Sequence, residues 1–147
     1  MVKKWRREMR RLFYCGSNLR VEERSRTAET AVATITIQTI DLKSDMPSVP
    51  EALQRLECEL TLARKQGSAV VKLIHGYGSS GVGGDIRVAV QRRLYELAEA
   101  GRIRGCIFGE NWSKSDEQTW RLLRDNPALK NDPDLGRRNL GITIVVL

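Results

Sequence analysis

The residues best suited to chemistry are a single histidine and the glycines that follow it. Residues 75–83 read HGYGSSGVG, and His75 is the only histidine in the chain. An imidazole, with an ordinary pKa of about 6.5, can donate or accept a proton at neutral pH. Glycines let the backbone approach a phosphate closely, and a helix that follows them offers free N–H groups. The segment predicts a phosphate-binding turn beside a general acid or base; the alternative is a hydrogen-bonded structural histidine. The glycines concerned are Gly76, Gly78, Gly81 and Gly83.

The spacing Gly76-x-Gly78-x-x-Gly81 also matches the dinucleotide fingerprint, which needs an acidic residue about 20 residues further on. The acid nearest to that role is Glu110, thirty-four residues after Gly76. We therefore expect no nicotinamide cofactor, while binding of a small nucleotide phosphate at this turn stays open as a weaker alternative.

Strands and helices that alternate along the chain must position this turn. Residues 34–42, TITIQTIDL, alternate with period two and are rich in β-branched side chains, which predicts a half-buried strand. Ser48 and Glu51 form a capping box for a helix that ends at Gly67. Further strands are predicted over 69–74, 102–108 and 140–147, with a second helix carrying Ile86 to Ala98 and ending at Gly101. His75 thus closes the second strand, where open α/β sheets bind their ligands.

Residues 110–139 form an insert before the last strand. Within it, Asp116 predicts the cap of a short helix that Pro127 terminates. The insert is either a functional lid or a packed surface insertion in which Trp112 and Trp120 cover the sheet edge. The order of elements predicts an α/β domain with a mixed four-stranded sheet, parallel at the start and with an antiparallel final strand.

The positive charge of the chain is concentrated at its start. The net charge is +7, and residues 1–33 hold nine Lys and Arg against four Glu, while residues 34–147 hold sixteen basic and fourteen acidic residues. Basic arms bind nucleic acid or anionic surfaces through counterion release. Trp5, Phe13 and Tyr14 lie among these arginines and can stack on bases. We expect an arm over 1–33 and a domain over 34–147; the alternatives for the arm are a solvated leader and a targeting leader.

The three cysteines exclude a disulfide framework, because they are odd in number and scattered. We expect free thiols and a cytoplasmic location. No metal site is predicted from the histidine and cysteines. The longest apolar run, at residues 141–147, is far shorter than a membrane span, and no secretory signal is present, so no membrane partner is expected.

Taken together, these motifs resemble the small MutS-related (Smr) domain family. The family's D-L-[HR] motif corresponds to Asp41-Leu42-Lys43, and its H-G-x-G motif to His75–Gly78. The helix beginning IRVAV (residues 86–90) resembles the family's L-R-x-A-V, and GITIV (residues 141–145) resembles its closing strand. Two departures are Lys43 in place of His or Arg, and the long insert. The resemblance covers about residues 34–147 and implies a two-layer β-α-β-α-β-β sandwich.

The resemblance also implies nucleic-acid binding, with endonuclease or nicking activity on RNA or DNA. On that hypothesis His75 moves a proton, while Lys43 and Arg87 stabilise charge on the phosphate together with the glycine turn. Asp41 orients a basic partner or helps to hold Mg²⁺ or Mn²⁺; the alternative is a turn cap at the strand end. The competing hypothesis is a binding module for RNA, DNA or a ribosomal surface that has no catalytic activity.

Overall fold

The structure, a computed structural model, describes residues 37–78 and 84–147. The predicted arm over 1–33 and two of the predicted phosphate-binding glycines, Gly81 and Gly83, lie outside the described residues. The elements follow the predicted order: β1 (Gln38–Asp41), α2 (Val49–Lys65), β2 (Val70–Ile74), α3 (Asp85–Glu99), β3 (Gly105–Phe108), the short 3-10 helix η1 (Gly109–Asn111), α4 (Glu117–Asp125), the 3-10 helix η2 (Pro127–Asn131) and β4 (Ile142–Val146).

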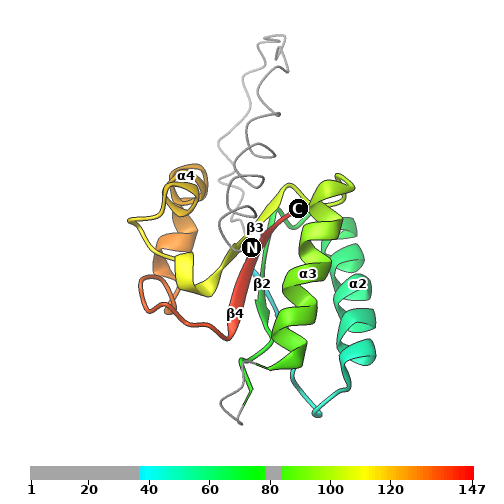
Figure 1. Cartoon of the computed structure of the whole chain (residues 1–147). Helices are drawn as coiled ribbons and strands as arrows, with labels where there is room; N and C mark the ends of the chain where they lie inside the picture. The colour runs from blue at the N-terminus through cyan, green and yellow to red at the C-terminus, as the bar shows by residue number, and fades with distance from the viewer. Residues whose placement is uncertain (1–36, 79–83) are drawn as a thin grey trace, which may run out of the picture. The chain divides into compact units, whose positions relative to one another are not determined.

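The four strands form one mixed sheet in the order β1-β2-β4-β3 (Figure 1). β1 and β2 are parallel, whereas β4 is antiparallel to both β2 and β3. The predicted fold class is thereby confirmed, including the antiparallel final strand. The C-terminal strand, β4, lies in the interior of the sheet between β2 and β3, which agrees with its nearly unbroken apolar sequence.

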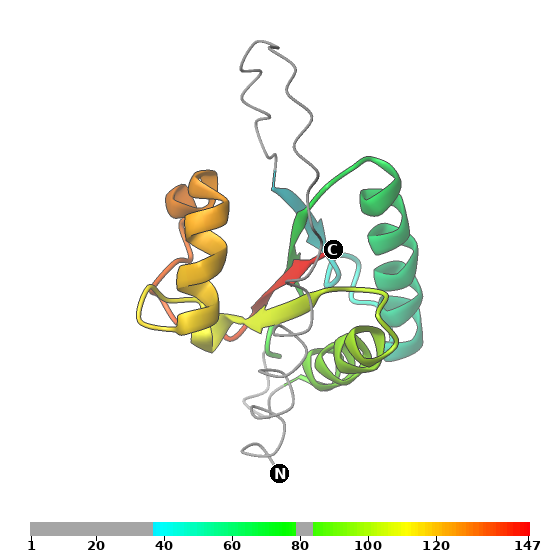
Figure 2. The ribbon, with the colours of Figure 1, turned by 90° about the horizontal axis from the view of Figure 1, so that it is seen from above.

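Helices α2 and α3 cover one face of the sheet (Figure 2). The predicted capping box starts α2, where the Glu51 carboxylate accepts a hydrogen bond from the Ser48 N–H at 2.7 Å. The predicted third strand is shorter than expected, because the Arg102 N–H still donates to the Leu97 carbonyl at the end of α3. The buried side chains that these helices present are Ala52, Leu56, Leu60 and Ala63 from α2, and Val90, Leu94, Leu97 and Ala98 from α3.

The insert covers the opposite face of the sheet, as Figure 2 shows for α4. Its predicted helix is present, and the Asp116 side chain caps it by accepting from the Thr119 N–H at 2.9 Å. Of the two tryptophans expected at the sheet edge, Trp112 is fully buried under the sheet face, whereas Trp120 is 55% exposed. The insert is therefore a packed layer that shares a hydrophobic core with this face of the sheet. Its members are Val70, Ile107, Ile142 and Ile144 from the strands and Trp112, Leu122, Leu123 and Leu129 from the insert.

A buried ion cluster ties this layer to the middle of the sheet. Lys72 in β2 is 6% exposed, and its ammonium donates to Asp132 Oδ2 at 2.9 Å and also to Asp134. The Trp112 indole N–H donates to Asp132 Oδ1 at 3.2 Å, and the Asn139 amide donates to Asp134 Oδ1 at 2.9 Å. The cluster fixes the chain between η2 and β4 relative to β2. None of the described helices is both long and apolar enough to cross a membrane.

Candidate phosphate-binding site

The candidate site lies at the sheet edge where β1 and β2 both end. Asp41 pairs with Ile74 in the parallel register, and the Leu42 N–H donates to the Ile74 carbonyl at 2.8 Å. The residues that follow each strand, Lys43 and His75, therefore emerge at the same edge. The Gly141 carbonyl, just before β4, accepts hydrogen bonds from the N–H groups of His75 and Gly76, both at 3.0 Å.

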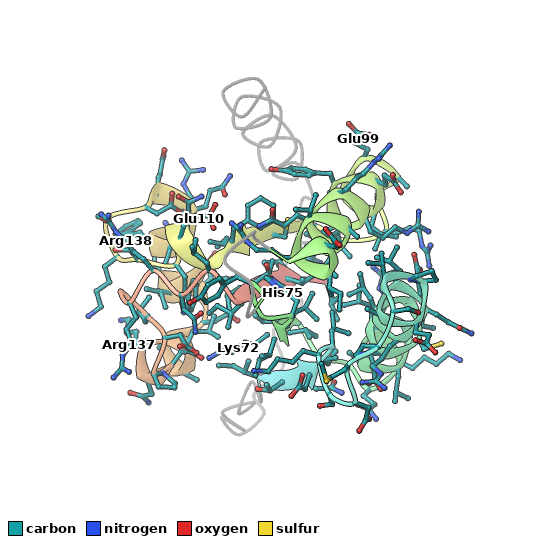
Figure 3. The ribbon with its side chains drawn as sticks, turned by 60° about the horizontal axis from the view of Figure 1, so that its bottom comes forward. Lys72, His75, Glu99, Glu110, Arg137 and Arg138 are labelled. Carbon is teal, nitrogen blue, oxygen red and sulfur yellow. The ribbon has the colours of Figure 1, made fainter. Side chains whose placement is uncertain are left out.

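The His75 side chain is almost completely enclosed, with 3% of the residue exposed. Figure 3 looks toward this edge and shows His75 among the strand ends. Its Nδ1 lies 2.7 Å from the Gly76 carbonyl oxygen, and its Nε2 lies 2.9 Å from Thr143 Oγ1. A carbonyl can only accept, so Nδ1 carries the proton and, in the neutral ring, Nε2 accepts from the Thr143 hydroxyl.

Burial lowers the pKa of His75 below its usual value, and the nearby Arg87 charge lowers it further, against opposing hydrogen bonds and the Glu110 charge. The neutral imidazole is therefore the form held at neutral pH. Because both ring nitrogens have partners, a proton transfer to substrate requires Nε2 to exchange its bond with Thr143. Through its contact with Thr143, His75 also joins the end of β2 to β4.

Asp41 has partners within its own turn. Its carboxylate accepts hydrogen bonds from the Lys43 N–H at 2.9 Å and from the Ser44 N–H at 3.2 Å. Partial burial acts to raise the pKa of Asp41, but these hydrogen bonds and the Lys43 charge outweigh it and lower the pKa. This arrangement matches the alternative of a turn cap, which leaves the carboxylate less free to orient a second group.

Lys43 and the first two glycines of the turn come together in the structure. The Lys43 Cδ lies 3.5 Å from the position that a Cβ would take on Gly76, so the lysine side chain runs along the turn. Gly76 and Gly78 have φ values of 66° and 87°, a conformation that favours glycine. Between them, Tyr77 is 54% exposed. In the part of the chain that is described, Lys43 has no carboxylate within 4.0 Å, so its charge is available.

Helix α3 begins beside the turn, because the Gly84 N–H donates to the Tyr77 carbonyl. Gly84 supplies no side-chain cap to this helix. Arg87, in the first turn of α3, is paired with Glu110 through an Nη2–Oε2 distance of 3.2 Å. Its buried Nε has no hydrogen-bond partner among the residues that the structure describes. Sequence reasoning missed this pair: Glu110 carried no role in the predicted site, and its separation of 23 residues from Arg87 gives no local signal. Arg87 is thus partly neutralised before any phosphate arrives.

Two further glycines, neither of them assigned to the predicted site, shape the same edge. A Cβ on Gly109, after β3, would lie 1.7 Å from the Asn139 carbonyl oxygen, so only glycine fits there. A Cβ on Gly141 would lie 3.3 Å from the Gly76 Cα. Among the residues that the structure describes, no group of three or more His, Cys, Asp or Glu side chains could hold a metal ion.

No protein-family model and no curated protein matches this sequence. Among solved structures, the chain is similar to the Smr domain of MutS2 from Thermus thermophilus, with 22% sequence identity and a TM-score of 0.47. The match covers 76% of this chain and 98% of that chain.

Proposed function

We propose that this chain is an Smr-like nucleic-acid-binding domain that contacts the sugar-phosphate backbone at the edge where β1 and β2 end. The proposal rests mainly on the position of Lys43. This exposed cation has no ion-pair partner among the described residues, and its side chain lies against left-handed Gly76. A phosphate at this turn would meet an ammonium group, closely approachable backbone and the uncapped start of α3.

Two other features support nucleic acid as the ligand. Residues 1–33 carry nine basic and four acidic residues, so the arm adds long-range attraction for a polyanion. The Tyr77 side chain, exposed between two glycines, offers an aromatic surface on which an unpaired base can stack. A ribosomal surface, which also presents RNA phosphates and bases, is a second candidate partner. We keep the expectation of a cytoplasmic protein, in which Cys58 and Cys106 are free thiols.

Binding is tested by fluorescence anisotropy with labelled single-stranded RNA, single-stranded DNA and branched DNA over a series of salt concentrations. Lys43→Ala is compared with Lys65→Ala, an exposed lysine at the far end of α2. Loss of one phosphate contact reduces the slope of log K against log salt by about 0.7, or about fivefold in affinity at 0.1 M salt. Equal affinities for the two variants, or binding that salt does not affect, would contradict the proposal.

Beyond binding, we propose that the domain cleaves the phosphodiester bond of RNA or DNA. In this proposal His75 acts as general acid or base, and Lys43 stabilises the phosphate charge. Its support is the neutral imidazole, which is the form a general base needs, at the end of β2 beside the turn. Nε2 would take a proton from the attacking oxygen once it exchanges its bond with Thr143. Mg²⁺ or Mn²⁺ would have to be held partly by the substrate, since Asp41 is the one carboxylate proposed for it.

Cleavage is tested with the same labelled substrates, with Mg²⁺, with Mn²⁺ and with a chelator. His75→Asn should abolish cleavage and leave the affinity within about twofold, while Thr143→Val, which frees Nε2, should retain cleavage. If the parent protein cuts none of the substrates but binds them with the predicted salt dependence, the chain is a binding module and His75 is structural.

A further inference from the structure

The insert carries two exposed arginines, Arg137 and Arg138, just before β4. Neither has a carboxylate within 4.0 Å among the described residues. The two arginines of α4 differ: Arg121 is paired with Glu117 and Arg124 with Asp125. Of the four arginines of the insert, only the two before β4 have no ion-pair partner among the described residues, although Arg137 is near enough to Asp134 to help lower the pKa of that carboxyl.

The segment that presents these arginines is fixed by hydrogen bonds. The Gly136 N–H donates to the Trp112 carbonyl at 2.8 Å, and the Arg137 N–H donates to the Asp134 carbonyl at 3.1 Å. Asn139 bridges Asp134 and the Gly141 N–H, each at 2.9 Å. Asp134 is itself held in place by its ion pair with the buried ammonium of Lys72. The arginines are thus carried by an anchored turn.

Arg138 has φ +53°, in the left-handed region that glycine or asparagine adopts at a lower energetic cost. Backbone geometry alone would favour glycine here, so the presence of arginine points to a role for its side chain.

This turn leads directly to the candidate site. Gly141 packs against Gly76, and three residues of chain from Arg138 to Gly141 span at most about 11 Å. Figure 3 shows Arg137 and Arg138 on the insert, to one side of His75 in the view toward this edge. The nearby carboxylates are already engaged: Glu110 with Arg87, and Asp134 with Lys72. An anionic strand leaving the glycine turn toward β4 would meet two unpaired guanidinium groups.

We propose that Arg137 and Arg138 bind the phosphates that neighbour those at Lys43 and Gly76, so that the insert extends the nucleic-acid-binding surface across the start of β4. The inference rests on the proposed function and adds a second contact region to it. Arginine suits this task, because its guanidinium can bind two phosphate oxygens at once.

The test measures anisotropy of a labelled 12-nucleotide single-stranded RNA, and of DNA of the same length, with the full chain. The double variant Arg137→Ala/Arg138→Ala is compared with Arg121→Ala/Arg124→Ala, which removes the same charge from the same insert. Two lost contacts reduce the salt slope by about 1.4, which corresponds to about 25-fold at 0.1 M salt. The control pair should change the affinity by less than about twofold.

The variant Arg138→Gly tests whether a loss of affinity comes from the missing side chain and not from a less stable fold. It should leave the melting temperature within about 4 °C of the parent or raise it, and still weaken binding about fivefold. If the double variant binds like the parent while Lys43→Ala is weaker, the inference is wrong and the proposed function stands. Equal losses of affinity for the two double variants would also overturn the inference, because they would show a general effect of net charge. If the parent binds neither oligonucleotide, the inference and the proposed function both fail.

Discussion

Replacing Lys72 by methionine should destabilise the packing of the insert on the sheet. The substitution keeps an apolar stem of similar length but removes the ammonium that Asp132 and Asp134 share. Lys72 and Asp132 both have side chains less than a tenth exposed, so the loss leaves a buried carboxylate without its cation. Breaking a buried pair from one side costs about 3–5 kcal/mol. The expected fall in melting temperature is about 10 °C or more.

The stability that the Lys72 cluster contributes should depend on pH. For Lys72, burial lowers the pKa, but the bonds and charges of Asp132 and Asp134 outweigh burial and raise it above 10.5. For Asp134, burial raises the pKa, but Lys72 and Asn139 lower it below 3.8. The ion cluster therefore contributes its full stabilisation between about pH 4 and pH 10.5. This stabilisation is lost as the pH falls below about 4 or rises above about 10.5.

Urea unfolding at pH 7, followed by tryptophan fluorescence in a Trp5→Phe/Trp120→Phe background, measures the effect. Trp112 reports on the cluster directly, because its indole N–H is bonded to Asp132. The triple variant Lys72→Met/Asp132→Leu/Asp134→Asn removes the charges together and should recover much of the stability. A free energy of unfolding within about 0.5 kcal/mol of the parent for Lys72→Met alone would show that the ion cluster does not stabilise the fold.

Three further outcomes follow from single residues. The folded pKa of His75 lies below 6.5, so protonation opposes folding; stability should fall as the pH drops below about 6.5, and melting curves of His75→Asn should lack this dependence. Gly109→Ala should lower the free energy of unfolding by more than about 2 kcal/mol in urea titrations, because its Cβ would overlap the Asn139 carbonyl; a neutral result would show that this contact can relax. Burial raises the pKa of Cys106 to about 12, so in a Cys15→Ser background a thiol reagent at pH 8 should label exposed Cys58 and spare Cys106 until urea unfolds the protein. Rapid labelling of both cysteines in the native protein would contradict this.

Elements governed by local rules were predictable from the sequence. The capping box of Ser48 and Glu51, the cap at Asp116 and the apolar strand Val70–Ile74 each encode their structure within a few residues. The antiparallel final strand also followed from the order of elements. Of the predicted site, Lys43 and the first glycines do lie together, because parallel strands bring their carboxyl ends to one edge.

Interactions between distant residues were not predictable. Lys72 lies within an apolar strand, and its partner Asp132 is 60 residues away, so no periodic pattern announces the pair. The pairing of Arg87 with Glu110 and the burial of His75 beside Thr143 depend equally on tertiary packing. In each case a polar side chain is satisfied by a neighbour that only the completed fold supplies.

The most direct test of nucleic-acid binding at this edge is a titration of the ¹⁵N-labelled full chain with a 12-nucleotide single-stranded RNA, followed by amide chemical shifts. Within residues 37–78 and 84–147, we expect the largest changes at Lys43, Tyr77, Gly78 and Arg87, and smaller changes at amides 135–141. Changes confined to residues 1–33, or centred on the far ends of α2 and α3, would contradict it.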